Sequence, residues 1–262
     1  MASTTEVLIT RTGADGRRLV ERLQPRVPVI HYAPVQLEGM PKAAATRDRL
    51  LDCLPVDILI APSAEALRRL AELVPPAQLA LPLVVVPGAG TARVGRQLGF
   101  ERIRYPARMG DSEHILALAE LQDVAGARVM IAAAAGGRDL IATRLRQRGA
   151  TVLPLEVYQR TAVPPTRAQI ERLRQAQSLI TLLASGGALL GLREQLPRDC
   201  WQTLIAQPLI APSPRVATMA KDAGCVSVAM AGGADDEAML DALVRVCPSL
   251  AAISYPVKGG LN

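Results

Sequence analysis

The sequence has few aromatic residues, few lysines and few histidines. Of its 262 residues only 2% are aromatic, so stacking of nucleic-acid bases on aromatic side chains is not expected. Thirty basic residues oppose twenty-four acidic ones, and only three of the thirty are lysines, so the net charge of +6 comes from arginine. No contiguous basic stripe accompanies this charge, and we do not expect nucleic acid as a partner. Arginine binds carboxylates through two parallel hydrogen bonds, although a GC-rich genome would also favour arginine without any functional meaning.

Metal-binding and membrane-spanning patterns are also missing. The four cysteines form no Cys-x-x-Cys pair and the only histidines are His31 and His114, so no metal site is expected. Met1–Arg11 does not resemble a secretory signal peptide, which predicts a cytoplasmic protein with reduced thiols. The most apolar stretches, Leu79–Pro87 and Ser178–Leu192, are too short or too rich in glycine and serine to span a membrane. We therefore expect a globular chain with no membrane partner.

Short aliphatic runs bounded by turn-forming residues recur along the chain. Because these runs are continuously apolar rather than alternating, they predict buried strands of parallel sheets. Amphipathic segments with leucines at helical spacing lie between them, and the alternation of strand and helix predicts an α/β, doubly wound fold. The predicted strands are Val7–Thr10, Val56–Ala61, Leu83–Val86, Val129–Ala133, Thr151–Val157, Leu179–Leu183, Pro208–Ala211 and Val226–Met230.

The two halves of the chain resemble each other. The apolar run that starts at Val7 resembles the one that starts at Val129. The run that precedes Ser63 likewise resembles the run that precedes Ser185. In both matches the corresponding residues are 122 positions apart. A third match follows in the same order, which favours two related halves, although any two strand–helix–strand units share some likeness. Two α/β lobes of this size would form a cleft, faced by the loops at the carboxyl ends of their strands.

Small and polar residues follow several predicted strands. Arg11 precedes a turn that opens a helix, where backbone amides can hold an anion. The spacing of Gly13 and Gly16 in that turn is not a dinucleotide fingerprint, so no nucleotide cofactor is expected. Ser63 and Ser185 stand where helix N-caps belong, a role that accounts for them on its own, and helix starts on both lobes would also suit an acidic ligand. Neither serine lies in a Gly-x-Ser-x-Gly elbow, so a hydrolase is not expected.

Two further turns, Gly88–Ala92 and Ser213–Ala217, correspond in the two halves. Both can present backbone amides to a ligand, and Thr91 adds a hydroxyl, whereas both are also explained as tight connections that need glycine or proline. Arg138 follows two glycines and can either meet a carboxylate or form a solvated pair with Asp139.

Tyr158 closes the predicted strand Thr151–Val157 and is followed by Pro164 and Pro165. Proline pairs favour an extended connection, so we expect this segment and its counterpart, Val29–Val35, to link the two lobes. A phenol titrates near pH ~10 and is a proton donor at neutral pH, which makes Tyr158 a candidate general acid. The alternative is a strand-end tyrosine whose hydroxyl contacts water.

In this order these segments resemble the uroporphyrinogen-III synthase family, and the resemblance covers nearly the whole chain. Each motif is short, and the ordered set carries the resemblance. The segments are Val7–Arg11, Asp57–Leu67, Val86–Ala92, Gly136–Leu140, Arg148–Val152, Glu156–Arg160 and Leu183–Leu189.

The resemblance implies a bilobed enzyme with two doubly wound, flavodoxin-like parallel sheets. A discontinuous first domain would comprise residues 1–33 and 163–262, a second domain, 37–157, would be inserted into it, and a two-stranded linker near 29–36 and 157–163 would join them. The reaction implied is that of a lyase in tetrapyrrole biosynthesis. Hydroxymethylbilane, a linear tetrapyrrole with eight carboxylates, would lose water and close to uroporphyrinogen III with inversion of the last ring, without a cofactor. We expect a monomer.

The family's tyrosine that assists departure of the hydroxyl group matches Tyr158. The expected substrate-binding residues are Arg11, Ser63, Ala64, Gly88, Thr91, Arg138, Ser185, Gly186, Ser213 and Pro214. The sequence departs from the family's usual pattern at Thr12, Pro62, Ala133, Ala184 and Val216. Each departure removes a possible polar contact, and the alternative to an enzyme is a two-lobed binding protein that kept the fold without the catalysis.

Overall fold

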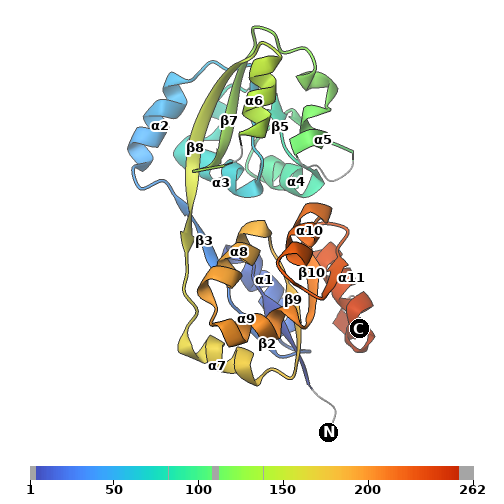
Figure 1. The fold of residues 1–262 in the computed structure, drawn as a ribbon. Helices are drawn as coiled ribbons and strands as arrows, with labels where there is room; N and C mark the ends of the chain where they lie inside the picture. Colours follow the sequence, from blue (N-terminus) through green and yellow to red (C-terminus); the bar gives the residue numbers. More distant parts are fainter. Residues whose placement is uncertain (1–3, 82, 108–111, 138, 254–262) are drawn as a thin grey trace, which may run out of the picture. The chain divides into compact units, whose positions relative to one another are not determined.

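Two compact units divide the chain, which the computed structural model describes over residues 4–81, 83–107, 112–137 and 139–253. The discontinuous unit contains the chain up to Gln36 and from Thr161 onward, and the inserted unit is the segment Leu37–Arg160. Each unit has its own sheet (Figure 1) and its own hydrophobic clusters. Among the described residues no helix is long and apolar enough to cross a lipid bilayer.

The discontinuous unit is built on a five-stranded sheet in the order β11-β10-β9-β1-β2, with neighbouring strands parallel. Helices α7 to α10 cover one face and helices α1 and α11 cover the other, which explains why its inner strands are continuously apolar. The strands are β1 (Thr5–Ile9), β2 (Val29–His31), β9 (Ser178–Leu182), β10 (Pro208–Ala211) and β11 (Ser227–Met230). The helices are α1 (Gly13–Leu23), α7 (Arg167–Gln175), α8 (Gly186–Gln195), α9 (Arg198–Ile205), α10 (Pro214–Asp222) and α11 (Asp236–Val246), followed by a 3-10 segment, Pro248–Ile253.

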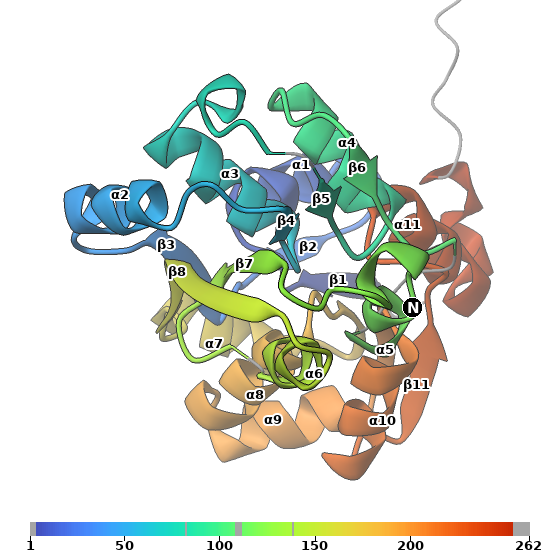
Figure 2. The same ribbon diagram turned by 90° about the horizontal axis from the view of Figure 1, so that it is seen from above.

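The inserted unit is built on a six-stranded sheet in the order β3-β8-β7-β4-β5-β6. Helices α2 to α4 pack against one face and helices α5 and α6 against the other, as Figure 2 shows. The strands are β3 (Val35–Gly39), β4 (Ile58–Ile60), β5 (Val84–Val85), β6 (Ile103–Arg104), β7 (Arg128–Ala134) and β8 (Thr151–Ala162). The helices are α2 (Ala43–Asp52), α3 (Ala64–Leu73), α4 (Ala89–Gln97), α5 (Ser112–Leu116) and α6 (Leu140–Gln147), with 3-10 turns at Pro76–Gln78 and Ala119–Leu121.

The register of the two sheets confirms the repeat predicted from the sequence. Val7 of β1 pairs with Ile180 of β9, and Val129 of β7 pairs with Ile58 of β4. Val7 and Val129 are 122 positions apart, and so are Ile58 and Ile180. The order β2-β1-β9-β10-β11 in one sheet therefore corresponds to β8-β7-β4-β5-β6 in the other, and β3 is an addition to the inserted unit.

The chain passes between the units within two neighbouring strands. The unit boundaries fall after Gln36, inside β3, and after Arg160, inside β8, and these two strands are adjacent in the sheet. The segment Val29–Val35, expected as a linker, differs from this expectation at its start, where Val29–His31 form the edge strand β2.

Strand β2 forms because its central side chain is apolar and its open edge is capped. Ile30 is 2% exposed. Arg172 donates from Nη1 to the carbonyl oxygen of Val29 at 2.7 Å, and Gln169 donates from Nε2 to that of His31 at 2.7 Å. Side chains that occupy an edge in this way prevent it from pairing with another strand. Three residues are too few to show a strand period in the sequence.

The predicted α/β fold with parallel sheets is confirmed, and each predicted apolar run overlaps a strand. The missed strands are short or partly polar. Strand β6 has only two residues, and β3 alternates partly buried and exposed positions beside β8. Neither pattern stands out from a loop, because pairing with a neighbour defines both strands.

Candidate active site

Most of the predicted site residues follow the carboxyl ends of parallel strands. In the inserted unit, Ser63 follows β4, Gly88 follows β5, and Tyr158 is the last residue of β8 that pairs with β7. In the discontinuous unit, Ser185 follows β9 and Ser213 follows β10. Because neighbouring strands are parallel, the residues of each unit lie at one edge of its own sheet, the edge at which α/β proteins bind ligands.

A β-bulge in β8 directs Tyr158 toward helix α3. Ala133 of β7 pairs with Glu156, but Ala134 pairs with Tyr158, so Val157 is an extra residue in β8. Side chains of a regular strand alternate between the two faces. The bulge breaks this alternation, and Val157 and Tyr158 are both buried in the cluster that contains helices α2 to α4. The bulge therefore places the phenol on the α3 side of the sheet.

Tyr158 and Ser63 contact each other through their hydroxyl groups. Oη of Tyr158 lies 3.2 Å from Oγ of Ser63, which also accepts the backbone N–H of Ala66 at 3.2 Å. Ser63 is the N-cap of α3, as predicted, and the cap fixes the direction of its side chain. Tyr158 is only 4% exposed. The structure thus brings the predicted acid together with one predicted binding residue.

Arg160 covers the ring of Tyr158. Its Cζ atom lies 5.9 Å from the ring centroid, which is a cation–π distance. Arg160 was not among the predicted site residues. The signal was present, because residues two apart on a strand point to the same face, and Arg160 is two residues after the candidate acid.

Two hydrogen bonds hold the turn after β7 against β8. The backbone N–H of Ala135 donates to the carbonyl oxygen of Tyr158 at 2.7 Å, and that of Gly136 donates to Oε1 of Glu156 at 3.2 Å. Gly136 has φ +63, in the left-handed region that favours glycine. Glu156 was not predicted, because its partner is 20 positions away. The predicted residue Arg138 follows this turn and lies outside the described residues.

Serines cap two helices of the discontinuous unit. Oγ of Ser185 accepts the N–H of Ala188 at 3.1 Å, as the repeat predicts, and Oγ of Ser213 accepts that of Val216 at 3.4 Å. Gly186 is buried, and a Cβ atom there would lie 2.8 Å from a methionine sulfur of α10. Close packing of α8 on α10 therefore accounts for this glycine.

The other predicted residues are backbone positions at helix starts. Ala64 begins α3, Gly88 is the N-cap of α4, and Thr91 lies in the first turn of α4. First-turn N–H groups have no partner inside their own helix, so both helix starts can donate hydrogen bonds to an anion. Pro214 begins α10 but has no N–H. It can preorganise the helix start and cannot donate.

Arg11 is held in an ion pair. Its guanidinium donates to the carboxylate of Asp236 and to the carbonyl oxygen of Ala234, and Arg18 donates from Nε to the same carboxylate at 2.8 Å. The side chains of Arg11 and Asp236 are only 16% and 10% exposed. The hydrogen bond to Asp236 raises the pKa of the Arg18 guanidinium. Arg11 therefore has a structural partner, which the sequence could not show because Asp236 follows it by 225 positions.

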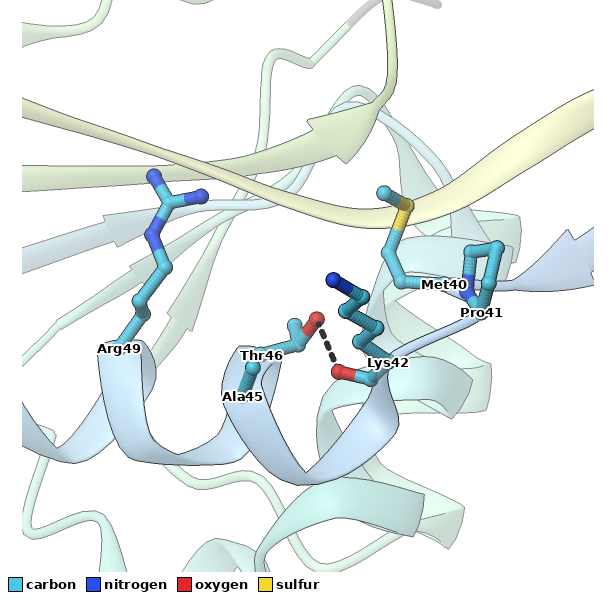
Figure 3. A pocket seen from close by; sticks show the side chains of 6 residues that line it. All are labelled: Met40, Pro41, Lys42, Ala45, Thr46 and Arg49. Atoms are coloured by element: carbon cyan, nitrogen blue, oxygen red, sulfur yellow. Dashed lines mark hydrogen bonds between the residues drawn. The ribbon is translucent and has the colours of Figure 1, made fainter.

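Figure 3 shows a pocket of about 300 Å³ at the start of α2. Oγ1 of Thr46 donates to the carbonyl oxygen of Lys42 at 3.2 Å in this pocket. The lining residues are Met40, Pro41, Lys42, Ala45, Thr46 and Arg49. They include none of the predicted site residues, so this pocket is distinct from the strand-end positions described above.

Among the described residues, neither thiols nor metal-binding groups contribute to the candidate site at the strand ends. Within the part of the chain that the structure describes, no group of three or more His, Cys, Asp and Glu side chains is arranged to hold a metal ion. Burial raises the pKa of the thiols of Cys200 and Cys225. Both thiols therefore stay protonated at neutral pH and are poor nucleophiles.

Comparison with known proteins gives a consistent result. The model of the family described as "Uroporphyrinogen-III synthase HemD" matches residues 25–241. The uroporphyrinogen-III synthase of Escherichia coli (strain K12) is 31% identical over 250 residues, which is 90% of this chain and 99% of that protein. The protein of the same name from Salmonella typhimurium (strain LT2) is 31% identical over 249 residues, with 90% of this chain and 99% of that protein covered.

Solved structures with the same name share the fold. A crystal structure of a mutant uroporphyrinogen III synthase from Thermus thermophilus matches 95% of this chain and 100% of that chain, with a TM-score of 0.64 at 18% identity. The synthetase from Helicobacter pylori 26695 matches 93% and 100%, with a TM-score of 0.61 at 13% identity. The resemblance predicted from the ordered motifs is confirmed, and the chain belongs to the uroporphyrinogen-III synthase family.

Proposed function

We propose that this chain closes hydroxymethylbilane, a linear tetrapyrrole, to uroporphyrinogen III, with loss of water and inversion of the last ring. Membership of the family over residues 25–241 supports this lyase activity. The observation that supports the assignment of roles is the hydroxyl pair of Tyr158 and Ser63 at the carboxyl edge of the inserted unit's sheet. Tyr158 is the proposed general acid.

The arrangement of the two hydroxyls can leave the phenolic proton free for the substrate. Oγ of Ser63 accepts the N–H of Ala66, and its own hydrogen can be donated to Oη of Tyr158. In that arrangement the O–H of Tyr158 donates to the departing hydroxyl group. When the phenol loses its proton, the serine hydroxyl still donates to the phenolate oxygen and stabilises its charge.

The reaction balances without another reagent. The bond between the hydroxymethyl carbon and its oxygen breaks, and the oxygen leaves as water with the proton from Tyr158. The electron-poor carbon is attacked by a pyrrole carbon of the last ring, which gives a spirocyclic intermediate, and rearrangement inverts that ring. The proton released as the macrocycle regains its pyrroles returns to the phenolate, so water is the only by-product.

Helix starts at the strand ends are the proposed binding groups for the substrate's carboxylates. In the inserted unit these are the starts of α3 and α4, with Ser63, Ala64, Gly88 and Thr91. In the discontinuous unit they are the starts of α8 and α10, with Ser185, Gly186, Ser213 and Pro214. Positive partial charge at helix N-termini favours carboxylates, and backbone N–H groups donate to them without a side chain. This reliance on the backbone suits a sequence that departs from its family at several polar side chains.

The two compact units are the proposed lobes of the enzyme, with the inserted domain near residues 37–157 and strands β3 and β8 as the two-stranded linker. Unit boundaries after Gln36 and Arg160 support this division. We also propose a cytoplasmic monomer that does not bind nucleic acid. The lack of a contiguous basic stripe in the sequence supports the last point, because nucleic-acid-binding surfaces cluster their basic residues.

Product analysis tests the activity. Freshly generated hydroxymethylbilane is supplied, the products are oxidised to porphyrins, and type III is compared with the type I isomer that forms spontaneously. We expect an excess of type III over the no-protein control. Formation of type I alone, from folded protein, would contradict the activity and favour the non-catalytic binding protein.

Substitution of the phenol tests the role of Tyr158. Because general acid catalysis contributes about 100-fold or more, Tyr158→Phe should lower kcat by at least about 100-fold and leave the binding of product nearly unchanged. Tyr105→Phe is the matched control, because Tyr105 lies in the same unit and its ring is also covered by an arginine, Arg96, at 6.0 Å. Unchanged turnover in Tyr158→Phe would remove the tyrosine from the mechanism.

A further inference from the structure

Arg160 lies on β8 just past the point at which this strand stops pairing with β7. Tyr158 is the last residue of β8 that pairs with β7, and Arg160 follows it on the same face, past the end of that pairing. Arg160 is exposed, whereas Tyr158 beneath it is buried. The guanidinium therefore lies between the phenol ring and solvent, at the carboxyl edge where α3 and α4 also begin.

The guanidinium of Arg160 has no carboxylate partner among the described residues, and it makes no hydrogen bond with them. Several other arginines are paired with carboxylates, as Arg69 is with Glu65 at 2.7 Å and Arg172 is with Glu6 at 2.7 Å. The contact of Arg160 is with the ring of Tyr158. Stacking on a ring fixes the plane of a guanidinium and leaves its outward N–H groups available.

We propose that Arg160 binds a carboxylate of the tetrapyrrole and holds the reacting end of the substrate over the hydroxyl of Tyr158. This inference rests on the proposed function, because it concerns the same substrate and the same acid. A guanidinium donates two parallel hydrogen bonds to a carboxylate, so it fixes both the distance and the orientation of the group that it binds. A ligand in this position is anchored beside the proton donor, which is the role of a positioning contact in catalysis.

The proposal also explains the residue type. A lysine at this position would carry the same charge, but its ammonium group makes no bidentate contact and does not stack flat on a ring. Arg160→Lys should therefore keep part of the binding, and Arg160→Gln should lose most of it. Arg96 provides the matched control, since it lies over Tyr105 at 6.0 Å in the same unit but not over the proposed acid.

Steady-state kinetics with hydroxymethylbilane and equilibrium dialysis with uroporphyrin III test the proposal on wild type, Arg160→Gln, Arg160→Lys and Arg96→Gln. We expect Arg160→Gln to raise KM about tenfold and to weaken the binding of uroporphyrin III about tenfold, as loss of a charged hydrogen-bonded contact does. Its kcat should change less than its KM. Arg160→Lys should lie between wild type and Arg160→Gln, and Arg96→Gln should match wild type. Circular dichroism and the melting temperature show whether each variant is folded.

Three results would overturn the proposal. The first is an unchanged KM and an unchanged dissociation constant in folded Arg160→Gln. The second is an equal loss in Arg96→Gln, which would indicate only an effect of net charge. The third is a fall in kcat at constant KM, which would mean that Arg160 acts on Tyr158 rather than on the substrate. The dialysis separates this proposal from the proposed activity. If the wild-type protein forms no type III product but Arg160→Gln binds uroporphyrin III more weakly than wild type, only the activity is refuted. If the wild-type protein forms type III product and Arg160→Gln binds uroporphyrin III as wild type does, only the role of Arg160 is refuted.

Discussion

The repeat contains two serines, Ser63 and Ser185, that have the same role as helix N-caps but differ in one further contact. Ser63 and Ser185 both cap a helix from an extended backbone conformation, and their Oγ atoms accept an N–H at 3.2 Å and 3.1 Å. Loss of such a cap costs about 1 kcal/mol. Only Ser63 also reaches a tyrosine hydroxyl, Oη of Tyr158 at 3.2 Å, and a neutral hydrogen bond of this kind contributes about 1 kcal/mol. We therefore expect Ser63→Ala to lower the free energy of unfolding by about 2 kcal/mol and Ser185→Ala by about 1 kcal/mol.

A double-mutant cycle isolates the additional contact. Tyr158→Phe removes the same hydrogen bond from the other side, so the combined variant Ser63→Ala/Tyr158→Phe should be more stable than the sum of the single losses predicts, by about 1 kcal/mol. Ser185→Ala combined with Tyr158→Phe should show additive losses, because these two side chains belong to different units.

Urea unfolding, followed by circular dichroism, measures all of these variants. Equal losses for the two serines, together with a coupling energy between Ser63 and Tyr158 below about 0.3 kcal/mol, would refute the hydroxyl pair. The proposed route for the phenolic proton would then lose its support, since that route requires Ser63 to donate to Tyr158.

Three further predictions concern stability. Gly16→Ala should lower the free energy of unfolding by about 3 kcal/mol, because the new Cβ would lie 2.0 Å from the carbonyl oxygen of Arg11. Urea unfolding measures this loss. Asp236→Ala should lower the free energy of unfolding by about 3 kcal/mol, because the poorly exposed guanidinium of Arg11 would lose its partner. Burial raises the pKa of Tyr32 to about 12, against about 10 in the unfolded chain. The buried neutral phenol therefore favours folding fully below pH ~10, and this contribution should be lost as the pH rises from ~10 to ~12. Tyr32→Phe should reduce this fall in stability, and the buried thiols of Cys200 and Cys225, whose pKa is also raised, should account for a remaining slope.

The first two of these predictions have controls in the chain. Gly90→Ala, in a helix with no atom within 4 Å of the new Cβ, should raise stability by up to about 1 kcal/mol. Asp199→Ala removes an exposed ion pair with Arg174 and should leave the unfolding midpoint unchanged. Loss of stability in Gly90→Ala as large as in Gly16→Ala, or equal effects of the two aspartate substitutions, would contradict the steric and electrostatic arguments. A fall in stability above pH ~10 that is as steep in Tyr32→Phe as in wild type would contradict the argument for Tyr32.

The sequence predicts those parts of the fold that depend on one segment at a time. Apolar runs such as Val129–Ala133 mark strands that are buried on both faces, and the spacing of 122 residues predicts even the pairing of Val7 with Ile180, once Val129 and Ile58 are seen to pair. Strands β2, β3 and β6 were missed because their stability comes from neighbours and not from their own short sequences. The bulge at Val157 belongs to the same class, since it is defined by the register against β7.

The candidate site was predictable to a similar extent. Helix caps are local, so Ser63 and Ser185 were found from strand ends alone. The partner of Arg11 was not, because Asp236 approaches it only through the fold. Contact between Ser63 and Tyr158 also depends on the bulge, which determines the face on which the phenol lies. Sequence patterns identify which residues stand at strand ends, and packing decides which of them meet.

The discontinuous unit has a consequence for synthesis on the ribosome. Strand β1 is inside the sheet, between β2 and β9, and Val7 pairs with Ile180, which is made 173 residues later. The inserted unit, by contrast, is one continuous segment that is complete once Arg160 has been added. We expect the inserted unit to fold while the chain is still growing and β1, whose Val7, Leu8 and Ile9 are fully buried in the finished protein, to wait for the last third of the chain. Strand β1 thus leaves the ribosome before both of its neighbours in the sheet and is among the last strands to be enclosed. Protection of its apolar residues by chaperones during elongation therefore matters more for this chain than for one whose domains follow each other in sequence.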